Sequence, residues 1–139
     1  MKLLAYEVDK RSFLGVLNED ETWVYPVSAA GMEYRSMKDL IREAGPSEME
    51  MLDYISKKAP GDVMGAAPVD EIRVVSPIAE PDQDIICLGI NYMDHAEESA
   101  RFEKRAFEKP EKAIYFSKRV NRTNDPDGII PAHKNLTNQ

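Results

Sequence analysis

The stretch from residue 3 to residue 27, LLAYEVDKRSFLGVLNEDETWVYPV, decides the fold of the first part of the chain. It contains three short segments rich in apolar residues, 3–8, 12–17 and 22–27, which are separated by polar turns. Short strands joined by tight polar turns are typical of an antiparallel meander. Gly15 lies inside the second segment, where a glycine predicts a bulge or a close approach of another part of the chain.

The residues after the three strands have a helical pattern. Ser36 is a predicted N-cap with Asp39 three positions later, and Gly45-Pro46 is expected to end that helix. Ser47 is expected to cap a second helix that runs to about residue 58. The apolar stripes of the two helices are Met37, Leu40, Ile41 and Met51, Leu52, Ile55.

The methionines of this region, Met37, Met49 and Met51, are interpreted as core filling rather than as an adaptable binding face. Residues 60–71 are rich in proline, glycine and small side chains and are predicted to be a linker. We therefore expect residues 1–70 to form a small α+β domain in which two helices cover one face of an antiparallel meander.

The second half of the chain, residues 71–139, contains further strand signals. We expect strands at 72–75, 84–90 and 113–117, a turn at 124–128 and an edge strand at 129–131. The run IICLGI at 85–90 predicts a buried strand, and the lone cysteine within it, Cys87, is interpreted as a small core residue.

A polar cluster follows this apolar run directly. It consists of Asn91, Tyr92, Asp94, His95, Glu97 and Glu98. His95 and Glu98 are three positions apart, so on a helical turn they share a face and can form a hydrogen-bonded pair. A carboxylate beside an imidazole fixes its tautomer and raises its pKa, which suits a general base.

Two simpler interpretations of the cluster stay open. His95 can be a solvated residue at the start of a helix, and Asp94, Glu97 and Glu98 can complement the positive end of the helix dipole. A phosphate-binding loop is excluded, because Gly89 is the one glycine of the stretch and no G-x-G-x-x-G motif is present.

Composition narrows the classes of function. The formal net charge of −7 over 139 residues argues against a nucleic-acid partner. A run of eighteen apolar residues is absent and no signal-peptide pattern follows Met1, so we expect neither a membrane span nor secretion. With a single cysteine, no intrachain disulfide can form, which fits a reducing cytoplasm.

The stretch IICLGINYMDHAEE at 85–98, followed by KPEKAIYFSKRVN at 109–121 and DPDGIIP at 125–131, resembles the fumarylacetoacetate hydrolase family. The resemblance spans nearly the whole chain. It implies that residues 1–70 are the small N-terminal domain of many bacterial members. It also implies that residues 71–139 are the incomplete start of a mixed β-roll catalytic domain.

The resemblance also implies roles for individual residues. His95 matches the general base and Glu98 its carboxylate partner on a lid. Asn91, Tyr92 and Lys118 match positions that shape the substrate pocket. Asp94 matches an aspartate that reaches the metal in fumarylacetoacetate hydrolase itself, a contact that the smaller bacterial relatives generally lack. We further expect residues 93–112, which are rich in charge, to be the most mobile interior stretch.

The family implies Mg²⁺, Mn²⁺ or Ca²⁺, held by an E-x-E pair and a later aspartate. Those ligands are expected beyond Gln139, because Glu48-Met49-Glu50 lies on a predicted helix and is interpreted as a chance match. The 139-residue chain by itself is therefore expected to be inactive.

The expected substrate is a 2-oxo or 1,3-dicarbonyl acid, and the full-length enzyme is expected to be a cytoplasmic homodimer. The expected reaction is carbon–carbon bond hydrolysis, such as that of an acylpyruvate. Decarboxylation, keto–enol isomerisation and a non-catalytic accessory or oligomerisation role stay open.

Overall fold

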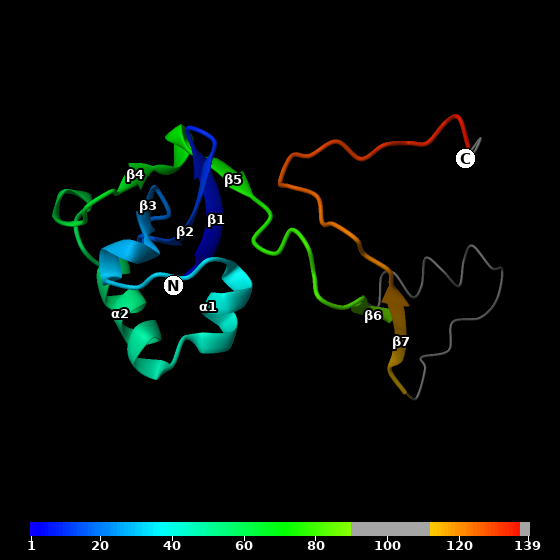
Figure 1. Cartoon of the computed structure of the whole chain (residues 1–139), viewed down its shortest axis with the longest axis horizontal. Coiled ribbons are helices and arrows are strands. Elements are labelled where there is room, and N and C mark those ends of the chain that lie inside the picture. The colour runs from blue at the N-terminus through cyan, green and yellow to red at the C-terminus, as the bar shows by residue number, and fades with distance from the viewer. Residues whose placement is uncertain (90–111, 137–139) are drawn as a thin grey trace. The chain divides into compact units, whose positions relative to one another are not determined.

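The computed structural model describes residues 1–89 and 112–136 (Figure 1). The chain divides into two compact units. Unit 1 comprises Met1–Ala79 together with the chain from Thr123 onward, and unit 2 comprises Glu80–Arg122. The expected family domains, residues 1–70 and 71–139, stay a prediction.

The three predicted N-terminal strands are present and pair in order. β1 (Leu3–Val8) pairs antiparallel with β2 (Arg11–Leu17), and β2 pairs antiparallel with β3 (Trp23–Pro26). Asp9 and Lys10 connect the first two strands with φ values of 50° and 64°. Two successive residues with positive φ form the type I′ turn, whose twist matches that of a β-hairpin.

The predicted linker at 60–71 is partly wrong, because two of its residues belong to the sheet. β4 (Ala67–Pro68) pairs with β3, and β5 (Arg73–Val75) pairs with β1, so the strand order is β4-β3-β2-β1-β5. Short 3₁₀ turns flank these strands at η2 (Pro60–Asp62) and η3 (Val69–Glu71). Proline and glycine in this stretch therefore mark turns within a packed unit.

The first helix begins as predicted. After a 3₁₀ turn, η1 (Val27–Ala30), comes α1 (Met37–Glu43), and the Ser36 hydroxyl accepts a 3.1 Å hydrogen bond from the backbone N–H of Asp39. This contact satisfies one of the N–H groups that have no partner within the helix.

The second helix begins earlier than predicted. α2 (Pro46–Ser56) has Gly45 as its N-cap, so the assignment of Ser47 as the cap is wrong. Proline suits the first helical position because its fixed φ fits the helix and its missing N–H is not needed there.

The main core lies between the helices and one face of the sheet (Figure 1). It contains Val16, Tyr25, Val27, Met37, Leu40, Leu52, Ile55 and Val63. Met49 packs against this core, whereas Met51 and Ile41 are exposed, so their predicted place in the core is wrong. A second cluster on the opposite sheet face contains Leu4, Tyr6 and Val24.

The described residues of unit 2 form an antiparallel pair, β6 (Ile85–Gly89) with β7 (Ile114–Lys118). The strand predicted at 85–90 is present, but the prediction that it is buried is wrong, because Ile86 is 75% exposed and Leu88 is exposed as well. In the described residues these two strands pair only with each other, and Tyr115 of β7 is also exposed. Cys87 is accordingly half-buried rather than a core residue.

The predicted strand at 129–131 is also wrong, since that stretch is irregular and both Ile129 and Ile130 are more than four-fifths exposed. Residues 93–111 of the predicted mobile stretch lie outside the described residues. None of the helices in the described part of the chain combines the length and the apolar character needed to span a bilayer.

Candidate functional site

Lys118 is the one predicted site residue within the described ranges 1–89 and 112–136. It ends β7 and is exposed, with its Nζ atom 5.8 Å from the ring centroid of Phe116. An ammonium at this distance interacts with the negative face of the ring. Asn91, Tyr92, Asp94, His95 and Glu98 lie outside the described residues, so the structure brings no two predicted site residues together.

The β6–β7 pairing fixes where the chain enters and leaves the stretch that carries the predicted base. Gly89 is paired with Ile114 at one end of the pair, and Ile85 is paired with Lys118 at the other. Gly89 and Ile114 therefore lie at the end of the pair opposite Lys118. At about 3.4 Å per residue, four residues of β-strand separate Lys118 from that end by about 14 Å.

Of the E-x-E letters at Glu48-Met49-Glu50, the first glutamate caps the start of α2. The Glu48 carboxylate accepts hydrogen bonds from the backbone N–H of Gly45 at 3.1 Å and from the Ser47 hydroxyl at 2.9 Å. The pKa of Glu48 is lowered, first by a hydrogen bond from its own backbone N–H and then by Ser47. A carboxylate committed in this way stabilises the start of α2.

The described residues also lack a metal site. Within 1–89 and 112–136, no group of three or more His, Cys, Asp or Glu side chains could hold a metal ion. The ligands expected beyond Gln139 stay a prediction.

Unit 1 has a small surface pocket of about 120 Å³. Both lysines of its lining are paired with carboxylates that also line it: Lys2 with Glu21, and Lys57 with Asp53 at 2.6 Å. Pockets that bind small molecules usually measure about 300–1,000 Å³. This pocket is therefore smaller than most pockets that bind small molecules, and no predicted site residue lines it.

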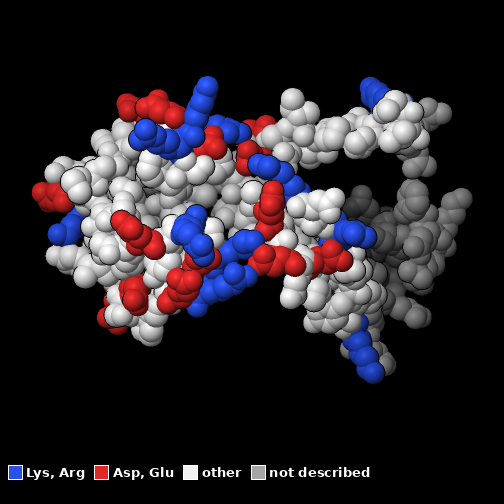
Figure 2. Space-filling view, viewed as in Figure 1, with Lys and Arg blue, Asp and Glu red and all other residues white. Residues whose placement is uncertain are grey.

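Charged side chains of both signs are interspersed over the face shown in Figure 2. The ion pairs of unit 1 include Arg73 with both Glu7 and Asp125, each at 2.7 Å. Neither pair was predicted from the sequence, in which Asp125 was assigned only to a turn. The turn signal itself was correct, since Gly128 N donates to Asp125 O at 3.0 Å.

Comparison with known proteins gives one informative similarity. The chain is 27% identical to oxaloacetate tautomerase YisK of Bacillus subtilis (strain 168), over a 149-residue alignment that covers the whole chain. The chain spans about half the length of that relative, 48%. No protein-family model matches the chain.

Proposed function

We propose that this chain is the N-terminal part of an enzyme of the fumarylacetoacetate hydrolase family that acts on a 2-oxo acid. The observation that carries the proposal is the similarity to an oxaloacetate tautomerase, a member of that family, along the entire chain. Oxaloacetate is a 2-oxo dicarboxylic acid, so the relative's substrate belongs to the class that the motif at 85–98 predicts.

The reaction we propose first is keto–enol tautomerisation. Converting an enol to its ketone removes the proton of the enol oxygen and adds a proton to the neighbouring carbon, so the atoms balance without water or any other reactant. A side chain that titrates near neutral pH suits both transfers. In this chain we assign that role to His95, with Glu98 as its partner, and substrate-binding roles to Asn91, Tyr92 and Lys118.

Carbon–carbon hydrolysis of an acylpyruvate is the second candidate, and the motif at 85–98 favours it because the same base can activate water. Decarboxylation uses a 2-oxo acid of the same kind. In each case Mg²⁺ or Mn²⁺ (or Ca²⁺) would polarise the 2-oxo group. The described residues do not fit such an ion, so we derive no step through it. The proposal that an E-x-E pair and a later aspartate hold the ion rests on the family resemblance.

We propose further that the full-length enzyme is a cytoplasmic homodimer that acts on small molecules rather than on nucleic acid or membranes. We also propose that the 139-residue chain alone is inactive. The alternative is a non-catalytic accessory or oligomerisation role. The exposed apolar residues of the β6–β7 pair, such as Ile86 and Tyr115, support that alternative for the isolated chain.

An assay of the longer protein that carries this chain separates these functions. The purified protein with Mg²⁺ would be given enol-oxaloacetate, keto-oxaloacetate and an acylpyruvate in parallel, and loss of the enol, release of CO₂ and release of pyruvate would be followed. We expect loss of the enol at a rate well above the uncatalysed one. Pyruvate release from the acylpyruvate alone would establish the hydrolase instead. Turnover of none of the three would contradict the proposed function.

A further inference from the structure

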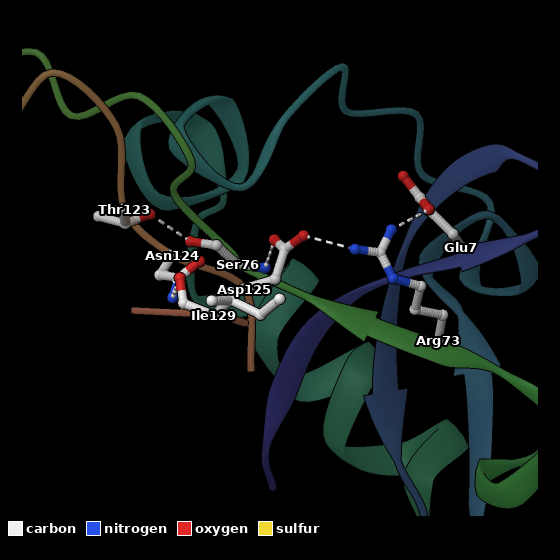
Figure 3. Close-up of polar contacts among 7 residues, drawn as sticks. All are labelled: Glu7, Arg73, Ser76, Thr123, Asn124, Asp125 and Ile129. Atoms are coloured by element: carbon white, nitrogen blue, oxygen red, sulfur yellow. Dashed lines mark hydrogen bonds and ion pairs between the residues drawn. The ribbon is translucent and has the colours of Figure 1, made fainter. Parts of the chain in front are cut away.

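A group of polar contacts joins the end of β5 to residues 123–125 (Figure 3). The backbone N–H of Ser76 donates to Asp125 Oδ1 at 2.9 Å, and Arg73 donates to Asp125 Oδ2 at 2.7 Å. The Asp125 carboxylate therefore uses both of its oxygens on two residues that lie about fifty positions earlier in the sequence.

The hydroxyl groups of Ser76 and Thr123 extend these contacts. Thr123 Oγ1 donates to the carbonyl oxygen of Ile78 at 2.8 Å, and the two hydroxyl oxygens are 2.5 Å apart. Because a hydroxyl has one proton, Thr123 spends its proton on Ile78 and Ser76 must be the donor between the two hydroxyls. The hydrogen bonds therefore run in one direction, from the Ser76 hydroxyl to the Thr123 hydroxyl and from there to the carbonyl oxygen of Ile78, so each acceptor orients its donor.

Arg73 connects these contacts to the sheet. Its guanidinium donates to Glu7 of β1 at 2.7 Å as well as to Asp125 (Figure 3). The planar guanidinium presents several donors in a fixed arrangement, which allows one side chain to hold two carboxylates. Asp125 is thus connected through Arg73 to both β5 and β1.

A backbone hydrogen bond also joins Ala79 and Thr123, because the N–H of Thr123 donates to the carbonyl oxygen of Ala79 at 2.8 Å. Ala79 and Thr123 are the residues that directly precede and follow unit 2. Every predicted site residue belongs to the stretch between them. That stretch therefore leaves unit 1 and returns to it at a single point.

We propose that Ser76, Thr123 and Asp125 form an anchor, a cooperative set of contacts that holds both ends of residues 80–122 together on unit 1. The anchor makes the N-terminal unit discontinuous in sequence. Closing a loop at its base also removes conformational freedom from the closed stretch before any ligand binds. The proposal rests on the contacts alone and does not depend on the proposed function.

Amide hydrogen exchange of the 139-residue chain tests the anchor, with the amides of Ser76 and Thr123 as reporters. In the unsubstituted protein both amides should exchange at least about tenfold more slowly than in an unstructured peptide. Asp125→Ala removes the acceptor of Ser76 directly but leaves the Thr123–Ala79 hydrogen bond in place. If the anchor is cooperative, the amides of both Ser76 and Thr123 should exchange at least about tenfold faster in this variant than in the unsubstituted protein. The amide of Val16 in β2 should stay protected.

Two controls separate the anchor from nonspecific effects. Asp127→Asn removes one negative charge from the same turn and should leave both amides protected, because Asp127 is exposed and its positive φ is one that asparagine tolerates. Thr123→Val removes the hydroxyl at nearly constant shape and should act like Asp125→Ala, whereas Thr123→Ser should not.

Three results would overturn the anchor. The first is unprotected Ser76 and Thr123 amides in the unsubstituted chain. The second is faster exchange of the Ser76 amide alone in Asp125→Ala, together with a residue 123 amide that stays protected in Thr123→Val. The third is equal acceleration by Asp127→Asn, which would assign the effect to the charge of the turn.

Discussion

The phenol of Tyr25 donates a 2.8 Å hydrogen bond to the carbonyl oxygen of Lys58, two residues beyond the end of α2. Tyr25 lies on β3 and is fully buried in the main core, so this bond connects the sheet to the end of the helix. Lys58 lies beyond α2, so the tyrosine hydroxyl holds the turn that follows the helix against the sheet.

We expect Tyr25→Phe to lower the free energy of unfolding by about 0.5–1.5 kcal/mol, the usual net value of one hydrogen bond. Urea unfolding at neutral pH measures this change. Tyr54→Phe is the matched control, because the Tyr54 side chain is exposed and keeps its ring. Equal midpoints for Tyr25→Phe and the unsubstituted protein would show that the hydrogen bond contributes nothing to stability.

The buried phenol of Tyr25 also predicts that the free energy of unfolding depends on pH in the alkaline range. Burial, with smaller contributions from Asp20 and Asp62, raises the pKa of Tyr25 above its ordinary value of 10.0. The folded state thus holds this proton more tightly than the unfolded state, so its contribution is complete below pH 10.0 and is lost as pH rises through the raised pKa. The difference in free energy of unfolding between the unsubstituted protein and Tyr25→Phe should therefore narrow as the pH rises above 10.0. A difference that stays constant or widens would contradict the raised pKa.

Gly15 is the position in β2 where a larger residue should be costly. A Cβ atom there would lie 2.9 Å from Tyr6 Cε1 and 3.1 Å from the backbone oxygen of Tyr25, and closer still to a methyl group of Val24. Overfilling a packed core typically costs about 1–3 kcal/mol, so Gly15→Ala should destabilise by that amount. Gly61→Ala is the control, since no atom lies within 4 Å of the added methyl group. Equal thermal midpoints for the two variants would refute the close packing.

The carboxylate of Glu48 predicts that the free energy of unfolding depends on pH in the acid range. Its pKa is lowered below the ordinary value of 4.5, first by its own backbone N–H and then by Ser47. Its contribution to stability is thus complete above pH 4.5 and is lost as pH falls through the lowered pKa. We expect Glu48→Gln to lower the urea midpoint at neutral pH and to match the unsubstituted protein in strong acid. Glu50→Gln, a substitution at an exposed position of the same helix, should leave the urea midpoint unchanged both at neutral pH and in strong acid. An equal effect of both substitutions would exclude a capping role for Glu48.

Local signals in the sequence predicted the parts of the fold that local chemistry determines. The N-cap at Ser36 and the close approach at Gly15 depend on neighbouring residues and on the absence of a side chain, so both were found. The pairing of 3–8 with 12–17 follows from apolar segments joined by a short polar turn, and β2 begins one residue earlier than predicted, so the turn has two residues. The cap at Gly45 was missed because Ser47 has the stronger intrinsic preference for that position, and the proline between them decides the outcome.

Features that depend on distant residues were not predicted. An apolar run such as IICLG predicts burial only where another layer covers it, and the described residues provide no such layer for Ile86 or Tyr115. The contact between Arg73 and Asp125 joins positions 52 apart, which no local pattern encodes. The candidate site shows the same limit, since Lys118 is placed by β7 whereas the predicted base His95 and its predicted partner Glu98 lie outside the described residues.

The central claim is that His95 is the base of an enzyme acting on a 2-oxo acid, and the two histidines of the chain allow a matched test. In the longer protein that carries this chain, His95→Ala should lower kcat for enol-oxaloacetate conversion by about 10²–10⁴-fold and leave Mg²⁺ affinity nearly unchanged. Glu98→Gln should give a smaller loss, and His133→Ala, at an exposed position, should give none. Full activity in His95→Ala, or weakened Mg²⁺ binding with activity restored by excess Mg²⁺, would contradict the assignment.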